Sequence, residues 1–385
     1  MNKIILLTSF IITGLYVVAQ NTSIPDSNFE QALIDLGLDS VLNGSIPTAN
    51  IDTVSILYIP NKFISDLTGI EDFNDLKNLG CYNNQLTSLD VSQNTALESL
   101  LCSNNLITSI NVSQNTLLTS LLCSSNSLSI LDVVQNSNLV ILRCNDNQLS
   151  SLDVSQCDVL VALDCGANQL NSLDVTQNIN LINLNCGTNE LTSLDVSQNL
   201  TLELLTFHVN QLTSIDVTQN VVLTNLDCDF NQLLALDVTQ NPFLDLLYCF
   251  NNQLSYLDVS QNIYLDRLAC YDNQLICLNL KNGNNNQMSY FGTFNNANLT
   301  CIEVDDDAWS SSYWTVGTGE IDTQMYFSNN CGNNCTTGLD VLSGSVDRQL
   351  LKIIDVTGRE TGYKPNMVLI YLYSDGSTER VFSGQ

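Results

Sequence analysis

Apolar and polar positions in the middle of the chain follow a pattern that repeats every 21 residues. Each unit reads L-x-x-L-x-C-x-x-N-x-L-x-x-L-D-V-S/T-Q-N-x-x, as in the unit that begins at Leu139. The Leu, Cys and Val positions alternate with polar or variable positions, which is typical of a strand with one buried face. A repeat this short cannot bury its apolar face alone, so successive units must stack. We therefore predict a solenoid with one coil per unit and a short strand in each half of the unit.

The cysteines of the repeat form one column of apolar character. Nine cysteines follow the 21-residue step, with Phe207 in the one remaining position: Cys81, Cys102, Cys123, Cys144, Cys165, Cys186, Cys228, Cys249 and Cys270. A position that accepts Phe is an apolar position. Parallel strands lie about 4.8 Å apart and their side chains point the same way, whereas a disulfide needs converging Cβ atoms roughly 3.8 Å apart. We predict buried thiols packed as small apolar groups, and no metal site, because clustered CxxC spacing is missing.

Two asparagine columns accompany the cysteines. The first is complete in ten units: Asn84, Asn105, Asn126, Asn147, Asn168, Asn189, Asn210, Asn231, Asn252 and Asn273. The second runs from Asn94 to Asn262 and is interrupted only by Cys157. An Asn at a bend can bond backbone groups of its own coil and of the next one. We interpret both columns as structural ladders.

The unit resembles the leucine-rich repeat, in which LxxLxLxxNxL forms the strand of a curved parallel sheet. Its second half, LDVSQN, is similar to the nested variety called IRREKO. The resemblance covers residues 57–280 with ten coils, and it departs from the usual pattern in having Cys where Leu is commoner. It implies a leucine-rich-repeat solenoid with parallel β-sheets and a concave face.

The flanks of the solenoid predict further regions. Residues 1–20 have the three regions of a secretory signal peptide: a basic start, an apolar run and a small residue, Ala19, near the end. Residues 21–56 predict an N-terminal cap with a short helix, and residues 281–335 predict an irregular C-terminal cap. The exported context favours a disulfide between Cys301 and Cys331 in that cap. Cys277 and Cys335 are a second candidate pair.

The tail, residues 338–385, predicts a small β-domain with alternating strands and a hairpin turn at Asp375 and Gly376. It resembles the C-terminal sorting domain of the type IX secretion system of Bacteroidetes. The matching KxxDxxGR segment consists of Lys352, Asp355, Gly358 and Arg359. The resemblance implies export by that machinery to the medium or the outer surface of a Gram-negative bacterium. An independent β-domain or a third cap is the alternative.

Charge restricts the partners and raises a question about cations. With 40 acidic and 11 basic residues the net charge is −29, which repels phosphate backbones and anionic lipid and excludes nucleic acid as a partner. An outward Asp column recurs in the second half of the unit: Asp90, Asp132, Asp153, Asp174, Asp195, Asp216, Asp237 and Asp258. Neighbours in such a column repel by roughly 1 kcal/mol in water. Nearby Ser or Thr side chains, or bound cations such as Ca²⁺, can offset this repulsion. We expect weak counterion binding and no cofactor.

Catalytic signatures are sparse in the sequence. His208 is the sole histidine and occupies a variable column, and no glycine-rich phosphate loop, HExxH or CxxC motif occurs. We predict a protein that is not an enzyme. A calcium-dependent, polysaccharide lyase-like β-solenoid is the alternative, but its basic catalytic residue would have to be Arg143 or Arg267, almost six units apart. A structural surface-layer component is a third hypothesis.

The variable positions on either side of each cysteine indicate a recognition surface, because they point outward while the second half of the unit is nearly uniform. Aromatic residues gather there on consecutive coils, as in interface anchors. The candidate ligand-binding residues are Arg143, Asp164, Asn185, Thr206, His208, Asp227, Phe230, Tyr248, Phe250 and Tyr271. Scattered surface residues, or a cover for the C-terminal cap, are the alternative. We predict binding of a protein or glycan through the concave face, in adhesion or attachment.

Overall fold

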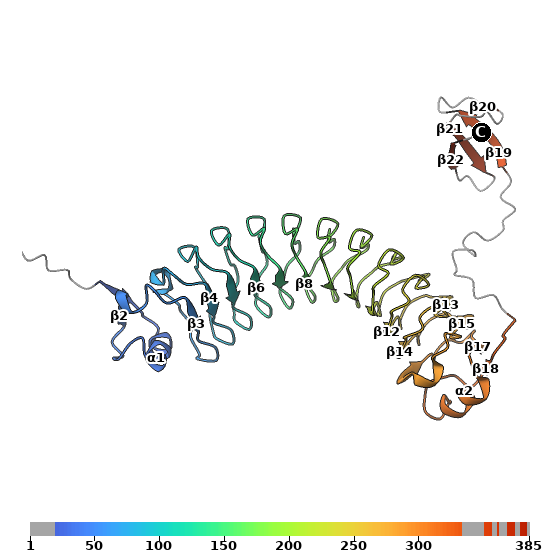
Figure 1. Cartoon of the computed structure of the whole chain (residues 1–385), viewed down its shortest axis with the longest axis horizontal. Helices are drawn as coiled ribbons and strands as arrows, with labels where there is room; N and C mark the ends of the chain where they lie inside the picture. Colours follow the sequence, from blue (N-terminus) through green and yellow to red (C-terminus); the bar gives the residue numbers. More distant parts are fainter. Residues whose placement is uncertain (1–19, 333–349, 356–359, 362–367, 374–377, 383–385) are drawn as a thin grey trace, which may run out of the picture.

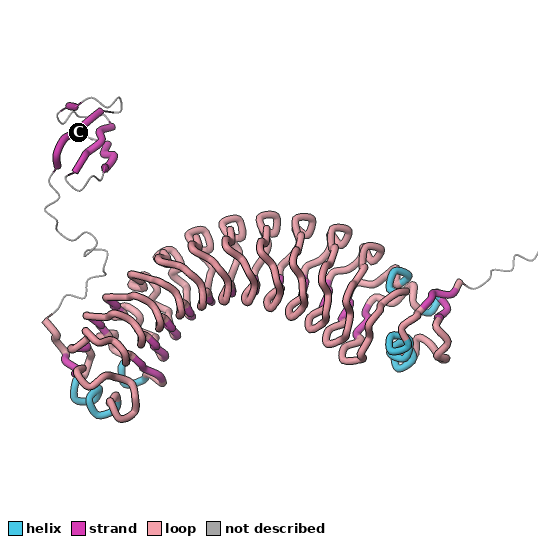
Figure 2. Tube along the Cα trace, turned by 180° about the vertical axis from the view of Figure 1, so that it is seen from behind, coloured by secondary structure: helices cyan, strands magenta, loops and turns pink. Residues whose placement is uncertain are grey.

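The coils stack into a curved solenoid whose inner side is lined by one long parallel sheet (Figures 1 and 2). The computed structural model describes residues 20–332, 350–355, 360–361, 368–373 and 378–382. The predicted signal peptide therefore lies almost wholly outside the described residues, as do Cys335, Gly358, Arg359, Asp375 and Gly376.

Twelve strands form the concave sheet, one from each coil. They are β3 (Ile56–Tyr58), β4 (Asn78–Gly80), β5 (Ser99–Leu101), β6 (Ser120–Leu122), β7 (Ile141–Arg143), β8 (Ala162–Asp164), β9 (Asn183–Asn185), β10 (Leu204–Thr206), β11 (Asn225–Asp227), β12 (Leu246–Tyr248), β14 (Arg267–Ala269) and β16 (Tyr290–Gly292). Between β4 and β14 each residue pairs with the residue 21 positions further on, for example Leu142 with Leu163. The predicted leucine-rich-repeat solenoid is confirmed.

The second half of the unit forms strands only near the C-terminal end. A four-stranded parallel sheet consists of β13 (Tyr256–Asp258), β15 (Cys277–Asn279), β17 (Cys301–Glu303) and β18 (Tyr326–Ser328). In the earlier described coils this segment has only the isolated bridge between Leu89 and Ile110. The prediction of a strand in both halves of every unit is therefore wrong. The Asp carboxylate accepts the N–H two residues on, as Asp153 does from Ser155 at 2.9 Å, and the same turn follows β13, where Asp258 accepts the N–H of Ser260.

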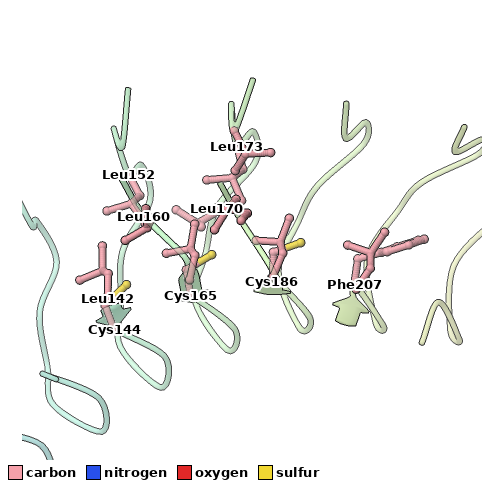
Figure 3. Close-up of a cluster of buried hydrophobic side chains, with 14 of the residues drawn as sticks. Leu142, Cys144, Leu152, Leu160, Cys165, Leu170, Leu173, Cys186 and Phe207 are labelled. Atoms are coloured by element: carbon pink, nitrogen blue, oxygen red, sulfur yellow. The ribbon is translucent and has the colours of Figure 1, made fainter. Parts of the chain in front are cut away.

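Leucine, valine and cysteine side chains of successive coils fill a continuous core (Figure 3). The nine cysteines of the column and Phe207 are at most 1% exposed, and the cysteines are free thiols. Burial raises the pKa of the Cys102 thiol to about 12, so this thiol stays protonated and packs as an apolar group. The buried-thiol prediction is confirmed.

Both asparagine columns are hydrogen-bonded ladders, as predicted. In the first, Asn105 donates from Nδ2 to the carbonyls of Cys81 and Cys102 and accepts the N–H of Leu86 at Oδ1. In the second, Asn199 donates to the carbonyls of Val175 and Asn178, at 3.0 and 2.8 Å. Each ladder residue thus ties its own coil to its neighbour, and in the second ladder it adds a second donor to carbonyls that already accept a backbone N–H, such as that of Asn178 from Leu181.

The N-terminal cap closes the first coil. It consists of β1 (Asn21–Ser23) antiparallel to β2 (Ser45–Pro47), helix α1 (Ser27–Asp35) and the 3₁₀ turn η1 (Thr48–Asn50); a second 3₁₀ turn, η2 (Ile70–Asp72), lies in the atypical first unit. Asp26 caps α1 by accepting the N–H groups of Asn28 and Phe29. Phe29 and Leu33 are buried on the side that covers the solenoid core.

The parallel coils continue beyond residue 280, where we expected the irregular cap to begin. Asn296 bonds the carbonyls of Cys270 and Thr293 and accepts the N–H of Leu275, which reproduces the first asparagine ladder. Thr293 takes the cysteine position, but 23 residues after Cys270, so the longer step conceals the repeat in the sequence. The end of the solenoid also includes η3 (Asn285–Gln287) and α2 (Asp307–Tyr313).

Disulfides and a separate sheet complete the C-terminal part. The predicted disulfide between Cys301 and Cys331 is present. Cys277 is also disulfide-bonded, while its candidate partner Cys335 lies outside the described residues. In the tail, β19 (Leu350–Asp355), β20 (Glu360–Thr361), β21 (Val368–Tyr373) and β22 (Thr378–Phe382) form an antiparallel sheet in the order β20-β19-β21-β22. Among the described residues, no helix is long and apolar enough to cross a membrane.

Candidate binding surface

The concave sheet carries the predicted binding residues in two outward columns. Because side chains alternate along a strand, the residues on either side of the buried cysteine face outward. The last residues of β7 to β12 form one column: Arg143, Asp164, Asn185, Thr206, Asp227 and Tyr248. His208, Phe250 and Tyr271 belong to the column after the cysteine, and Phe230 follows one residue later. The structure brings these residues together in three neighbouring groups.

The first group is an aromatic cluster that consists of Phe230, Tyr248, Phe250, Tyr271 and Phe294. The rings of Phe250 and Tyr271 stack with centroids 4.4 Å apart, and Tyr271 stacks on Phe294 at the same separation. Phe230 and Tyr248 meet Phe250 edge to face, at 5.5 and 6.4 Å. Contacts of this kind add roughly 0.5–1.5 kcal/mol per pair beyond burial. The four predicted aromatic residues are thus one contiguous surface.

Two aromatic residues of this region, Phe294 and Tyr290, were not among the predicted binding residues. Phe294 belongs to the column after the cysteine, but Thr293 replaces the cysteine and the step is 23 residues. Tyr290 and Tyr271 both approach Gly292 from above its Cα. A Cβ on Gly292 would lie 3.2 Å from the Tyr290 hydroxyl and 3.6 Å from the Tyr271 ring. The segment Thr293-Phe294-Asn295-Asn296 keeps the spacing of Cys-x-x-Asn, with Thr in place of Cys. This spacing is the feature of the sequence that could have identified Phe294 as a member of the outward column.

The second group joins His208 to two carboxyls. His208 Nδ1 lies 3.5 Å from Asp227 Oδ2, and its Nε2 lies 3.3 Å from the Thr188 hydroxyl. The Asp227 carboxylate raises the pKa of the His208 imidazole. Asp229 lies one coil after His208 in the same column and is 8% exposed. Its burial, together with the charge of Asp227, raises the pKa of its carboxyl to about 7. The group therefore retains protons near neutral pH.

Thr188, His208 and Asp227 follow the order of a nucleophile, a base and an orienting acid. His208 Nδ1 has no hydrogen-bond partner among the described residues, so Asp227 does not hold the imidazole in the manner of a hydrolase triad. The described residues also contain no group of three or more His, Cys, Asp or Glu side chains placed to hold a metal ion.

The third group lines a shallow depression of about 190 Å³ over β7 to β10. Its polar lining is Arg143, Asp164, Asn183, Asn185 and Thr206. Gly166 makes room for the Asn185 side chain, which lies over the glycine. A Cβ on Gly166 would lie 3.2 Å from the Asn185 amide nitrogen. Burial raises the pKa of the Asp164 carboxyl, against the effects of Arg143 and the Gly166 N–H.

Comparisons with known proteins agree with this architecture. No family model and no curated protein matches the sequence. Among solved structures, the functional domain of InlJ from Listeria monocytogenes is 30% identical, with a TM-score of 0.50 over 74% of this chain and 76% of that one. The chain belongs to the leucine-rich-repeat proteins. The InlJ domain includes a cysteine ladder, as does this leucine-rich-repeat protein.

Two further bacterial structures are similar to this leucine-rich-repeat protein. A leucine-rich-repeat protein of Leptospira interrogans is 25% identical, with a TM-score of 0.50 over 68% of this chain and 74% of that chain. An internalin of Listeria monocytogenes, inlF, is 17% identical, with a TM-score of 0.58 over 79% of this chain and 95% of that one, and it shows the fold alone.

Proposed function

We propose that this leucine-rich-repeat protein is an exported, non-enzymatic recognition protein that binds a protein or glycan through its concave face in adhesion or attachment. The observation that carries the proposal is the aromatic cluster over β11 to β16, which interrupts an otherwise regular acidic scaffold. Phe230 is 49% exposed, and the other four aromatic residues of the cluster are partly exposed. Phe and Tyr are enriched at the cores of interfaces, and Tyr is among the residue types that dominate binding energy there.

The cluster is preorganised for binding. Its rings are held against one another by stacking from coil to coil, and the asparagine ladder fixes the backbone of those coils. Little side-chain entropy is then lost when a ligand binds, because the rings already occupy one arrangement. The Asp227, Asp229 and His208 group at the edge of the cluster supplies polar contacts and orientation.

Export through the type IX machinery, to the surface or the surroundings of a Gram-negative bacterium, is part of the proposal. The signal-like start of the sequence and the tail segment with Lys352 and Asp355 support it. The tail strands β19, β21 and β22 pair as antiparallel neighbours, in keeping with the predicted β-domain. A reporter fused to residues 338–385, followed in cells with and without that machinery, tests this part alone.

The first experiment applies the purified protein to arrays of polysaccharides and of matrix and cell-surface proteins, with and without Ca²⁺. Retained protein and released product are read together. Retention without product supports recognition and identifies the ligand class. Unsaturated or reducing ends in solution would instead mean that the solenoid carries an enzyme, and ordered self-assembly without any retained ligand would indicate a surface-layer component.

A further inference from the structure

The first position of the turn after the second asparagine ladder changes along the solenoid, whereas the second position is already apolar and exposed at Leu117 and Val159 of the early coils. The residue directly after the ladder position is polar in the first four coils: Thr95, Thr116, Ser137 and Asp158. In the next five coils it is apolar: Ile179, Leu200, Val221, Pro242 and Ile263. Core packing does not require this change, because the polar and the apolar residues occupy the equivalent turn of coils that are otherwise alike.

These turns expose an apolar ridge, which consists of Ile179, Leu200, Val221, Phe243, Ile263 and Tyr264. Each of these side chains is between 46% and 56% exposed. The rings of Phe243 and Tyr264 stack with centroids 6.0 Å apart and planes 11° apart. The ten residues that follow the ladder positions in these five coils include no charged residue, in a chain with a net charge of −29. A contiguous apolar surface of this kind marks an interaction site.

The ridge is held rigidly in register. The residue before each ridge turn is a buried ladder Asn, as in Asn199, Asn220 and Asn241, whose side chain donates to the carbonyl of the previous ladder residue at 2.8 to 2.9 Å. The Thr201 hydroxyl also donates to the Leu181 carbonyl of the preceding coil, at 2.8 Å, and so ties two neighbouring turns together. The ridge side chains therefore project at the fixed spacing of the coils, and a partner meets a preformed surface.

We propose that the ridge is an interface between two copies of this chain. Val221 lies on the middle one of the five coils, so a twofold axis at this turn would place Ile179 against the partner subunit's Ile263. Such a contact is self-complementary and closes as a dimer. Six half-exposed side chains of about 150–200 Å² provide roughly 500–600 Å² per copy, or about 1,000–1,200 Å² for the two copies together, which is the size of a small, reversible interface.

The charge of the chain bears on which partner the ridge can bind. Two copies of net charge −29 repel one another at long range, while the ridge itself is uncharged. Screening by salt weakens the repulsion and leaves the apolar contact in place, so dimerisation should increase with ionic strength. An anionic bilayer would be repelled by the same charge, and a basic protein would find no carboxylate among the ridge residues. The proposal concerns a different surface from the concave face and does not depend on the function proposed for it.

Sedimentation equilibrium of the purified protein at about 50 mM and about 500 mM NaCl tests the proposal. We expect reversible dimers whose Kd falls with salt, and a Kd at least about tenfold higher for the double variant Val221→Ser, Phe243→Ser. The matched control is Leu117→Ser, because Leu117 is 50% exposed in the corresponding turn of an early coil. Circular dichroism verifies that all variants are folded.

Disulfide trapping tests the predicted arrangement directly. Val221→Cys should yield cross-linked dimers on mild oxidation, whereas Thr95→Cys, in the same turn outside the ridge, should not. A monomer at all concentrations and salts overturns the proposal, as does equal loss of association in the Leu117→Ser control. Flotation of the monomer with phosphatidylcholine vesicles, abolished by the double variant, would also overturn it and assign the ridge to a bilayer.

Discussion

The ring of Phe250 lies parallel to the ring of Tyr271 on the next coil, with 4.4 Å between their centroids. We predict that Phe250→Ala or Tyr271→Ala lowers the affinity for the ligand found on the arrays by at least about tenfold, because each removes an anchor from the middle of the stack. Binding assays together with thermal unfolding separate this loss from misfolding. Tyr82→Ala, in the same column of an early coil, is the matched control. Unchanged affinity of both cluster variants would exclude the aromatic cluster as the site.

The second asparagine ladder should contribute strongly to stability. In Asn199→Ala the buried carbonyls of Val175 and Asn178 each lose one of two donors and keep the N–H groups of Asn178 and Leu181. We expect the free energy of unfolding to fall by about 1–2 kcal/mol for the two lost hydrogen bonds. Denaturant unfolding measures the change. Asn138→Ala removes a comparable but exposed hydrogen bond to the Thr116 carbonyl, and it should cost less than about 0.5 kcal/mol. Equal costs would mean that burial of the ladder is unimportant.

Stability should decrease as the pH rises from about 4 to about 7. The folded state raises the pKa of the Asp229 carboxyl from 3.8 to about 7, so it binds a proton more tightly than the unfolded state does. The stabilisation from this proton is complete below the unfolded pKa and is lost as the pH rises through the folded pKa. The raised pKa of His208 acts in the same direction above its usual 6.5.

Thermal unfolding from about pH 4 to about pH 8 tests this prediction. Asp229→Asn should flatten the decrease and raise the stability of the protein at pH 8. Asp174→Asn is the contrasting variant, because hydrogen bonds from Thr176 lower the pKa of the Asp174 carboxyl and its contribution is instead lost at low pH. A decrease that persists unchanged in Asp229→Asn would contradict the assignment.

The acidic column should not need calcium. Asp174 accepts the Thr176 hydroxyl at 2.7 Å and the Thr176 N–H at 2.9 Å, and Asp216 is bonded in the same way by Thr218. We propose that these local donors offset the repulsion within the column. Millimolar Ca²⁺ should then raise the unfolding temperature no more than NaCl of equal ionic strength. A larger shift with Ca²⁺ would indicate specific sites.

The cysteine column should be chemically inert in the folded protein. Its thiols are buried, and burial raises the pKa of the Cys186 and Cys270 thiols to about 12, so little nucleophilic thiolate forms at pH 8. Iodoacetamide should label none of the ten free cysteines of the described chain before unfolding and all ten afterwards, as counted by mass spectrometry. Labelling of the folded column would mean that the coils open.

Most of the solenoid could be predicted because a repeat converts tertiary contacts into a constant sequence offset. Leu142 meets Leu163 because each coil repeats the last, so the buried columns, the asparagine ladders and the outward columns all follow from a period of 21. The cysteine column could be identified as apolar from Phe207 alone. The aromatic cluster was predicted for the same reason, since Phe250 and Tyr271 differ by one period.

Other features depend on tertiary structure, because the 21-residue period does not determine which segments pair as strands or which side chains are buried. Most second halves form no strand, although they share the apolar pattern and the Asp turn of β13, and the periodic pattern does not distinguish the two cases. Phe294 joins the aromatic cluster because a 23-residue coil still stacks in register on its neighbour. The burial of Asp229 and the exposure of the apolar ridge depend on how side chains of adjacent coils cover one another. The period places residues in columns, and packing between the columns decides which of them carry protons or meet a partner.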